Sequence, residues 1–295
     1  AKEFLTTYSN KNALNENSAG GTAYSNQYYL QGGSNEYLYM PFNDPVRGFI
    51  NSASIGIQKA IFGFGFSPDN SSTTNLVSNT GVVATDTTGV GTARRGVAAA
   101  GYGGDKAIFG YGTNAYPTSL SMTNKVSNTG VVSTDTTGVG TVRFSLAAAG
   151  YGGDKALFGY GGTYNSDLSF TNKVSNTGVV SNNTTGVGTA RWGLAAAGYG
   201  GDKAIFGYGQ SSVGATNITN LVSNTGVVAS NTTGVGTGRY MLAAAVYGGD
   251  RALFGYGYAL VSGTYAPLSM TNLVSNTGAV ATDTTGVGTA RYQLA

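Results

Sequence analysis

Residues 190–209 read ARWGLAAAGYGGDKAIFGYG, and this stretch decides the fold because close copies of it recur along the chain. Its second half, Lys-Ala-Ile-Phe-Gly-Tyr-Gly or a near variant, recurs about every 48 residues and begins at Lys59, Lys106, Lys155, Lys203 and Arg251. A second string, Val-Ser-Asn-Thr-Gly, also occurs five times, with its asparagine at Asn79, Asn128, Asn176, Asn224 and Asn276. A fixed period of this length marks an architecture built from one repeated supersecondary unit. The sequence therefore contains five copies of a single structural repeat.

Each repeat reads as four short strands separated by glycine-rich turns. Gly-Gly pairs accept the positive φ of a tight hairpin turn, and the short alanine runs lack a 3.6-residue apolar pattern. Ala156, Phe158 and Tyr160 alternate along one strand and are expected on one face. Four strands in about 48 residues match one propeller blade, so we predict an all-β, five-bladed β-propeller of four-stranded blades. In the third repeat the expected strands lie at residues 143–149, 155–160, 173–175 and 179–181.

The ends of the repeat array leave two ways to finish the ring. The Arg-led first strand occurs six times, from Arg47 to Arg291. Either residues 291–295 complete the fifth blade beside the divergent segment 47–58, or the array stays open. In both cases we expect residues 47–295 to form the propeller and residues 1–46, which lack the repeat, to form an N-terminal arm.

Composition narrows the chemistry that this chain offers. It has no histidine, no cysteine, a formal net charge of +3 without a basic cluster, and glutamates only before the repeats. These features argue against a nucleophilic triad, a disulfide framework and a phosphate-binding stripe. We therefore expect no enzymatic activity, no metal, no cofactor and no nucleic-acid partner. No apolar run is long enough to predict a membrane span, and the start, Ala1–Phe4, lacks a signal-peptide pattern.

Several charged residues recur at matching positions, which favours structural roles because an active site is normally unique. The arginines either form rings around an axis or, as we favour, bond to neighbouring blades. In the Thr-Asp-Thr-Thr link, Asn183 and Asn231 replace the aspartate in two repeats, so a negative charge is not required there. The aspartates of the Gly-Gly-Asp turns are expected to bond backbone amides, with a repeated cation or sugar site as the alternative. These turn aspartates are Asp105, Asp154, Asp202 and Asp250.

The quoted stretch resembles kelch-type propeller repeats, which share an Arg-led strand of small residues and a hydrophobic strand that ends in glycines. The resemblance covers residues 47–295, with Gly-Tyr-Gly in place of the kelch Gly-Gly doublet and without the spaced tryptophan. Residues 75–94, NLVSNTGVVATDTTGVGTAR, are similar to repeats of virion structural proteins of tailed marine phages. This similarity implies a tail, fibre or capsid-decoration protein, made in a host cytoplasm and located in the virion. An extracellular surface is the alternative location.

One segment of the repeat varies while the rest is nearly constant, namely the link between the second and third strands. Equivalent loops of a propeller emerge on one face, and variable loops rich in Tyr, Ser, Asn and Gly on a rigid scaffold are typical of recognition surfaces. The alternative is that these loops drift without constraint. The variable links contain residues 66–70, 113–117, 162–167, 210–214 and 258–265. We expect the binding residues to be Tyr116, Tyr164, Asn165, Tyr258 and Tyr265.

The N-terminal arm is polar apart from an aromatic patch at residues 37–42. Such a segment either orders against a partner or caps the ring as a frayed terminus. We expect it to attach the protein to other virion or particle proteins through Tyr37, Tyr39 and Phe42.

Three functional hypotheses follow. The first is a non-enzymatic structural or adhesive component of a phage-like particle, with the arm anchoring and the propeller facing outward. The second is a multivalent carbohydrate-binding, lectin-like propeller with one weak site per blade, which binds a cell-surface glycan through effective concentration. The third, a propeller glycosidase, is the least favoured. The sequence leaves the oligomeric state open.

Overall fold

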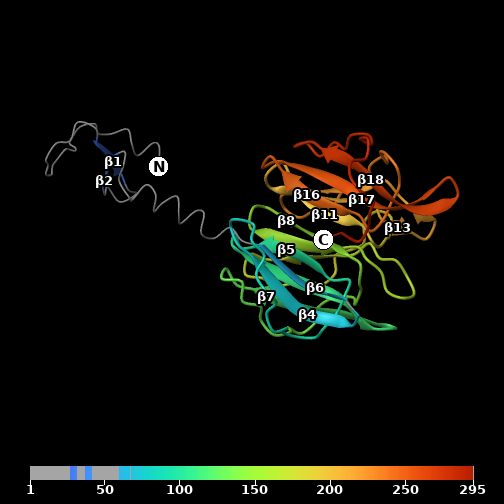
Figure 1. The fold of residues 1–295 in the computed structure, drawn as a ribbon, viewed down its shortest axis with the longest axis horizontal. Coiled ribbons are helices and arrows are strands. Elements are labelled where there is room, and N and C mark those ends of the chain that lie inside the picture. The colour runs from blue at the N-terminus through green and yellow to red at the C-terminus, as the bar shows by residue number, and fades with distance from the viewer. Residues whose placement is uncertain (1–26, 32–36, 42–59, 67, 295) are drawn as a thin grey trace. The chain divides into compact units, whose positions relative to one another are not determined.

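The computed structural model describes residues 27–31, 37–41, 60–66 and 68–294, and the chain divides into two compact units, 1–59 and 60–295. In the first unit, β1 (Gln27–Gln31) and β2 (Tyr37–Pro41) form an antiparallel hairpin in which Tyr29 pairs with Tyr39 (Figure 1). The second unit contains the repeats.

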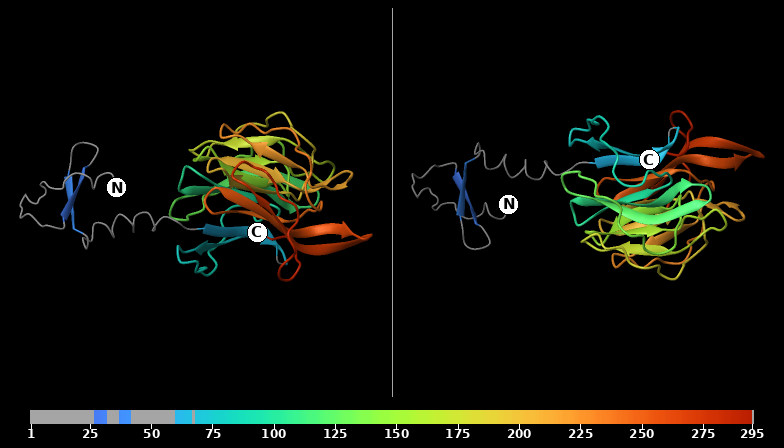
Figure 2. Two further views of the ribbon diagram at one scale, coloured as in Figure 1. Left: turned by 90° about the horizontal axis from the view of Figure 1, so that it is seen from above. Right: turned by 90° about the horizontal axis from the view of Figure 1, so that it is seen from below.

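The second unit is built from five small antiparallel sheets, one for each repeat, and its described residues contain no helix. This confirms the all-β expectation. The first sheet has two strands and the other four have three, and they succeed one another in the order of the chain (Figure 2). A short hairpin, β13 (Gln210–Ser211) and β14 (Gly214–Ala215), extends from the fourth repeat. The strands of the five sheets are β3 (Ala60–Phe66) and β4 (Asn70–Val77); β5 (Ala98–Tyr102), β6 (Lys106–Ala115) and β7 (Thr118–Val126); β8 (Ala147–Tyr151), β9 (Lys155–Gly159) and β10 (Thr171–Val174); β11 (Ala195–Tyr199), β12 (Lys203–Gly207) and β15 (Thr219–Val222); β16 (Ala243–Tyr247), β17 (Arg251–Val261) and β18 (Thr264–Val274).

The alanine run and the Gly-Gly turn explain the first hairpin of each three-stranded sheet. In the third sheet, Tyr151 pairs with Lys155 across the turn, and Gly152 and Gly153 have φ angles of 63° and 80°. Residues with side chains rarely adopt such angles, so glycine suits both positions. The buried alanines of β8 have small side chains, which let the neighbouring sheets approach closely.

The prediction of four-stranded blades is wrong for the described residues, because the fourth segment of each repeat does not form a continuous strand. In the second repeat it is attached to β7 only through isolated bridges, such as Val126 to Val132. Side chains interrupt the ladder: Asn124 Nδ2 donates to the Ser133 carbonyl, and the Lys125 amide donates to Ser133 Oγ. In the first repeat, residues 47–58, to which the sequence assigns the first strand, lie outside the described residues.

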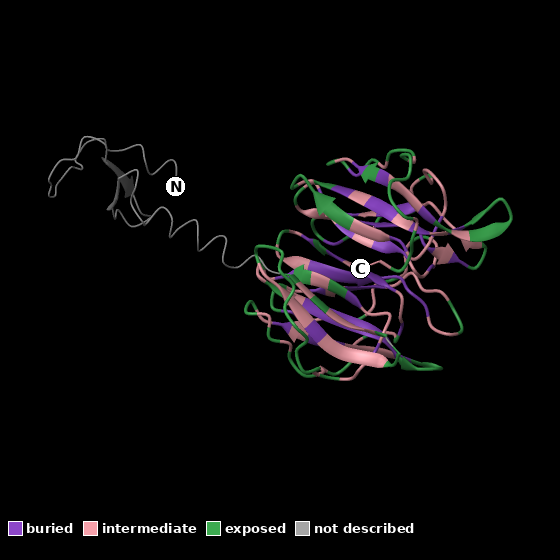
Figure 3. Ribbon diagram, viewed as in Figure 1, coloured by how far each residue is buried: buried purple, intermediate pink, exposed green. Residues whose placement is uncertain are grey.

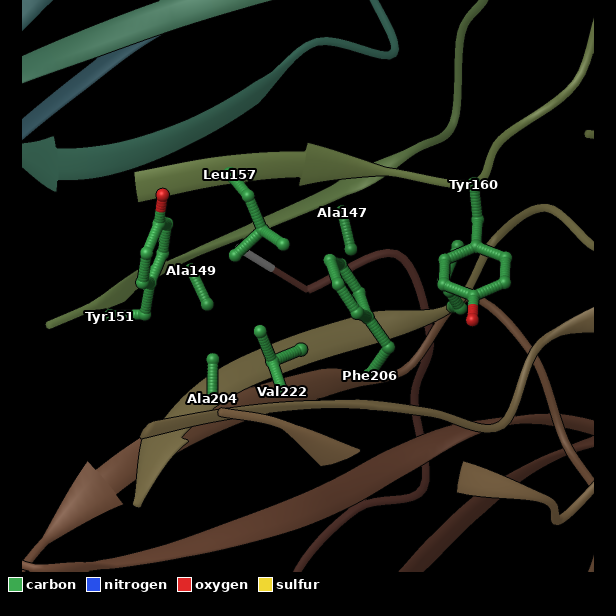
Figure 4. Close-up of a cluster of buried hydrophobic side chains, with 9 residues drawn as sticks. Ala147, Ala149, Tyr151, Leu157, Tyr160, Ala204, Phe206 and Val222 are labelled. Carbon is green, nitrogen blue, oxygen red and sulfur yellow. The ribbon is translucent and has the colours of Figure 1, made fainter. Parts of the chain in front are cut away.

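Successive sheets pack face to face, and the side chains between them form the core. Buried residues lie along the strands, whereas exposed residues concentrate at the turns and loops (Figure 3). Similar clusters join the second sheet to the third and the fourth to the fifth. Between the third and fourth sheets, Figure 4 shows the side chains of Ala147, Ala149, Tyr151, Leu157 and Tyr160 facing those of Ala204, Phe206 and Val222.

A phenylalanine–glycine contact makes this close packing possible. The Phe206 ring lies against Gly159 of the preceding sheet, where an added Cβ would be 2.5 Å from Phe206 Cζ. Glycine at this position therefore leaves room for the ring of the next sheet. The same contact recurs between Phe158 and Gly110 and between Phe254 and Gly207.

The expectation that Ala156, Phe158 and Tyr160 share one face is wrong for Tyr160. Ala156 and Phe158 pack against the second sheet, whereas Tyr160 packs against the fourth. The backbone at Tyr160 has a φ of 62°, in the left-handed region, and this breaks the two-residue alternation of an extended strand. The same conformation recurs in the other repeats at Phe64, Tyr111, Tyr208 and Tyr256.

A buried arginine joins successive sheets. The Arg191 guanidinium carbon lies 4.3 Å from the centre of the Tyr160 ring in the third sheet, and Nη2 donates to Asn220 Oδ1 of the fourth sheet at 2.7 Å. Its Nε donates to the Tyr208 carbonyl, and its Nη1 donates to the Thr189 carbonyl. These contacts confirm the expected sheet-to-sheet role of the arginines. The other fully buried members of this series are Arg94, Arg143 and Arg239.

Burial has an electrostatic consequence for these arginine–tyrosine pairs. Desolvation lowers the pKa of Arg191 from its ordinary value, and the neighbouring Tyr160 acts in the opposite direction. Desolvation likewise raises the pKa of Tyr208 to about 12. At neutral pH the pair is therefore a guanidinium cation against a neutral phenol, an arrangement in which the ring face attracts the cation.

The closed five-bladed ring stays a prediction. Among the described residues, the first and last sheets keep their outer faces exposed. Phe62 of the first sheet is 51% exposed, whereas the equivalent Phe206 is fully buried. Tyr247 of the last sheet is 36% exposed, whereas the equivalent Tyr199 is only 4% exposed.

Candidate recognition surface

The variable loops emerge along one edge of the five sheets, which we call the loop face. A backbone ladder runs along this edge through the residue two positions after each arginine. The amides of Ser145, Gly193, Met241 and Gln293 donate in turn to the carbonyls of Gly96, Ser145, Gly193 and Met241. The residue before each ladder member bridges to the loop of its own repeat: Arg95 to Thr113, Phe144 to Gly162, Trp192 to Gln210 and Tyr240 to Tyr258. Equivalent loops therefore occupy equivalent positions along one edge.

The loops differ in local structure, although their bases are alike. The second and fifth loops are hairpin extensions of their sheets, between β6 and β7 and between β17 and β18. The fourth loop is the β13–β14 hairpin, with the fully exposed Val213 at its tip. The third loop is closed by a side chain, because Thr163 Oγ1 accepts hydrogen bonds from the amides of Asn165 and Ser166.

Two of the predicted binding residues meet in a first aromatic cluster, formed by Phe144, Tyr116 and Tyr164. The Tyr116 and Tyr164 rings pack edge to face with centres 4.7 Å apart, and Phe144 lies 4.8 Å from Tyr164. The Tyr164 hydroxyl is 3.1 Å from Thr113 Oγ1 of the preceding loop. Tyr116 is 77% exposed, so this cluster presents one open ring on an ordered base.

The other two predicted tyrosines belong to a second aromatic cluster, which is larger. The Tyr258 and Tyr265 rings are almost parallel, at 2°, with centres 5.9 Å apart. Tyr292 lies 4.4 Å from Tyr258 on the C-terminal side. Tyr240 and Trp192 continue the cluster into the preceding repeats, at 5.9 Å from Tyr258 and 5.3 Å from Tyr240 respectively. Burial raises the pKa of Tyr240, and the neighbouring phenols add to this effect.

Sequence reasoning missed the residue that directly follows each arginine. This position supplies Phe144 and Trp192 and also Tyr240 and Tyr292, which form the inner part of both clusters. The signal was present, because the residue at this position varies between repeats as the loops do, yet it is aromatic after four of the six arginines. It was overlooked because it lies in the sequence beside the nearly constant arginine and alanine strand.

At the first loop, the residue after the arginine is Arg95 rather than an aromatic residue. The Arg95 guanidinium lies over the Phe66 ring at 4.7 Å, and its Nη1 donates to Asn70 Oδ1 at 3.0 Å. Asn70 Nδ2 in turn donates to the Asn114 carbonyl of the second loop. The predicted residue Asn165 is exposed at the tip of the third loop, next in sequence to Tyr164. No ring contact joins the two aromatic clusters within residues 60–66 and 68–294, so they are separate sites.

The Gly-Gly-Asp turns lie at the opposite edge, which we call the turn face. The Asp154 carboxylate accepts hydrogen bonds from Lys155 Nζ at 2.7 Å and Asn176 Nδ2 at 3.0 Å, and these donors hold its pKa below the ordinary value. Contrary to expectation, the principal partners of the carboxylate are side chains rather than backbone amides. The Asp154 carbonyl accepts from the Gly103 amide of the preceding sheet. Asp105, Asp202 and Asp250 each accept from the matching asparagine, which supports a structural role for all four.

The link aspartates also join sheets, and asparagine replaces them without loss of the contact. Asp135 accepts from the Thr92 amide at 2.9 Å and from Thr92 Oγ1 at 2.7 Å. In the next repeat, Asn183 accepts from the Thr141 amide and donates to Thr141 Oγ1. This confirms that the position does not require a charge.

The interchange of aspartate and asparagine at this position predicts how the free energy of unfolding depends on pH. Burial acts to raise the pKa of Asp135, but hydrogen bonds from Thr92 and Asn124 outweigh it and leave the pKa below the ordinary 3.8. Ionised Asp135 thus stabilises the fold above about pH 4, and this contribution is lost as the pH falls through the lowered value. We expect Asp135→Asn to cost about 1 kcal/mol or less at pH 7, and to flatten the decline of stability below pH 4. Urea unfolding between pH 7 and pH 3 measures both.

The reverse substitution, Asn231→Asp, is the matched control, because it adds a titrating group at the same position. It should steepen the acid decline. If the Asp135→Asn protein loses stability below pH 4 as the original chain does, this carboxylate does not contribute to the pH dependence.

The attachment residues expected in the arm are placed only in part. Tyr37 and Tyr39 lie on β2, where they pair with Gln31 and Tyr29 of β1. Phe42 lies outside the described residues.

Two further features concern the described part of the chain. Within it, no group of three or more His, Cys, Asp or Glu residues is arranged to hold a metal ion. None of its segments is a helix long and apolar enough to cross a membrane.

Comparison with known proteins assigns no relative. No protein-family model matches this chain, and no curated protein matches its sequence.

Proposed function

We propose that this chain is a non-enzymatic structural and adhesive component of a phage-like virion. In this proposal the five sheets are blades of a kelch-like β-propeller, and residues 1–46 anchor it to other particle proteins. The loop face recognises a target surface. The similarity of residues 75–94 to repeats of phage virion proteins supports the location.

One observation carries the recognition role. Differences between the five repeats concentrate on the loop face, where they assemble two aromatic clusters on a nearly constant scaffold. Tyrosine and tryptophan supply large contact areas at low entropic cost and dominate the energetics of many interfaces. Unconstrained drift of the loops would not by itself bring Tyr116, Tyr164 and Phe144 into mutual contact across two repeats.

The carbohydrate-binding alternative is favoured by a specific feature, the open Tyr116 ring and the half-exposed Tyr265 ring. Aromatic faces stack on the apolar faces of sugar rings. Because the rings gather in two clusters, this alternative has two principal sites rather than one weak site per blade. Two linked sites still strengthen binding to a multivalent surface through effective concentration.

The recognition role predicts the effect of removing the exposed rings. We expect Tyr116→Ala and Tyr265→Ala together to weaken adsorption to host cells, or to any glycan bound on an array, by about a hundredfold to a thousandfold, since such anchors carry roughly 2 kcal/mol each. Lys106→Gln on the turn face is the control and should bind as the original chain does. Unchanged binding of the double variant, with folding verified by unfolding midpoint, would exclude the loop face as the recognition site.

The anchoring role is tested separately in particles. Mass spectrometry of purified particles is expected to find this chain, and a chain that lacks residues 1–46 should no longer be incorporated. Normal incorporation of the shortened chain would exclude the arm as the anchor.

A further inference from the structure

The two ends of the sheet array carry unpartnered faces. We call the outer face of the fifth sheet the leading face; it carries Ala243, Ala245, Tyr247, Leu253 and Tyr256. The outer face of the first sheet is the trailing face, and it carries Ala60, Phe62, Val77 and Val83. Among the described residues neither face is covered: Phe62 and Val83 are about half exposed, and Tyr247 is more than one-third exposed.

Inside the array, the leading face of each sheet packs against the trailing face of the next sheet. The leading face of the fourth sheet presents Ala195, Ala197, Tyr199, Ile205 and Tyr208, and it packs on Ala252, Phe254 and Val274 of the fifth. The equivalent residues are buried at the other two junctions between three-stranded sheets, apart from Ala100, which is partly buried. The ends of the array therefore carry the two halves of an interface that the molecule forms internally.

The phenylalanine–glycine contact shows this complementarity at atomic detail. At internal junctions, a Cβ added at Gly159 or Gly207 would lie 2.5 Å from the ring of the next sheet. Gly255 is the equivalent glycine of the leading face, and no described ring lies against it. Phe62 is the equivalent ring of the trailing face, and none of the described glycines lies against it. One end of the array thus offers the recess, and the other offers the ring.

The polar groups of the two faces match as well. At the last internal junction, Arg239 Nη2 donates to Asn272 Oδ1 at 2.6 Å, and Thr237 donates to Asp283. At the leading end, Arg291 is exposed, although its guanidinium already lies 4.0 Å over the Tyr256 ring.

At the trailing end, the equivalent acceptors are already oriented. Asn75 Nδ2 donates to the Ala84 carbonyl and to Asp86 Oδ1, as Asn272 does with its own neighbours. The side-chain oxygen of Asn75, Oδ1, is where a guanidinium would bind. The second carboxylate oxygen of Asp86, Oδ2, is where a threonine would bind.

Among the described residues, the leading face and the trailing face are not packed against each other. The ring pair at each internal junction has nearly the same geometry, with centres 5.1 to 5.2 Å apart and planes at 62° to 65°. After four such steps both end faces are still exposed. These uniform packing contacts fix the position and angle of each sheet relative to the next, because packed interfaces adopt discrete arrangements rather than deform continuously.

We propose that the leading face of one copy binds the trailing face of a second copy of this chain, so that the sheet-to-sheet step continues between molecules. Phe62 of the second copy enters the recess at Gly255, Arg291 donates to Asn75, and Thr289 donates to Asp86. The contact is heterologous, since two different surfaces meet, and it therefore adds copies in one direction. This chain supplies the partner because its own trailing face presents the required residues in the required register.

The test uses two full-length variants that each block one face. Phe62→Asp removes the ring from the trailing face, and Gly255→Ala fills the recess of the leading face. Gly255 does not have a positive φ, so alanine there introduces no backbone strain. Sedimentation velocity over a wide range of concentrations should show that the original chain associates and that each variant alone is monomeric.

An equimolar mixture of the two variants should form heterodimers and no larger species, because one intact face of each kind remains. Val213→Asp, on the exposed tip of the fourth loop, is the control and should associate as the original chain does. Unfolding midpoints of the monomers verify that each variant folds.

Two outcomes would overturn the proposal. One is an original chain that stays monomeric at all concentrations, with amides of β3 and β17 protected from hydrogen exchange, which would indicate closure of a ring within one molecule. The other is association that survives in both single variants, which would place the contact elsewhere. Both readouts are independent of target binding by the loop face.

Discussion

Replacing Arg191 by alanine is expected to lower the free energy of unfolding by about 3–5 kcal/mol, because the change leaves three hydrogen-bond acceptors at a buried junction without their donor. Arg191 is fully buried, and it donates to the Tyr208 and Thr189 carbonyls and to Asn220 Oδ1. Its removal leaves these acceptors without a donor and opens a cavity beside the Tyr160 ring. Each buried acceptor without a partner costs about 1–3 kcal/mol.

Lysine should not rescue this site. A lysine ammonium lacks the planar fork that reaches three acceptors while it stacks on a ring. Arg191→Lys is therefore expected to lose most of the same stability, and urea unfolding measures both variants.

Arg291→Ala is the matched control in the last repeat. Arg291 stacks on Tyr256 as Arg191 does on Tyr160, but it is exposed and has only the Thr289 carbonyl as a described acceptor. Its loss should change the stability of the monomer little. Equal destabilisation by the two substitutions would show that stacking alone, rather than the buried hydrogen bonds, stabilises the junction.

The sequence predicts the repeated parts of this fold well, because they depend on local chemistry. The Gly152-Gly153 pair identifies a hairpin turn, and the alternation in residues 155–159 identifies a strand, without reference to any other repeat. The variability of the loops also points to the edge where the aromatic side chains gather.

What the sequence did not predict depends on contacts between repeats. The left-handed backbone at Tyr160 is stabilised by the packing of its ring under the Arg191 guanidinium, and period-two reasoning contains no such contact. The fourth segment is attached to the third strand only by isolated bridges, and in every repeat an asparagine side chain bonds one of its carbonyls, as Asn124 does with Ser133. The aromatic residues after the arginines join the loop face through bridges such as Phe144 to Gly162, which pair segments distant in sequence.

Closure of the ring also depends on contacts between repeats. The number of blades depends on the angle between sheets, and this angle is set by contacts such as that of Phe206 with Gly159 rather than by the length of the repeat. Counting five repeats could therefore give the number of sheets but not the state of the outer faces at Phe62 and Tyr247.

A substitution of Gly159 by alanine is expected to destabilise the protein by about 2 kcal/mol or more, as overpacking does in a rigid core. The added Cβ would lie 2.5 Å from Phe206 Cζ and 2.9 Å from Cε1, closer than real Cβ contacts allow. Phe206 is fully buried against the third sheet and packs edge to face on Tyr160, so it cannot move away. Gly159 does not have a positive φ, and the loss would therefore report packing rather than backbone strain.

Gly255→Ala is the matched control, because Gly255 is the equivalent residue in the last sheet. There an added Cβ meets only Thr271 Cγ2 at 3.3 Å and Leu253 Cδ1 at 3.7 Å. At a concentration where the chain is monomeric, this substitution should be neutral or stabilise by up to about 1 kcal/mol, since alanine loses less conformational entropy than glycine in a strand. The two substitutions are chemically identical, but only Gly159→Ala should destabilise the protein.

Replacing Phe206 by the smaller leucine should relieve the clash with an alanine at position 159. Phe206→Leu alone is expected to cost about 1 kcal/mol, but combined with Gly159→Ala it should cost less than the sum of the two single effects. Urea unfolding of the two single variants and the double variant gives this coupling directly. If the effects simply add, the glycine is not needed to admit the ring, and the recess at Gly255 would lose its role as a receptor for Phe62. A positive coupling would instead show that the phenylalanine–glycine contact, which recurs at all four internal junctions, sets the spacing of the sheets.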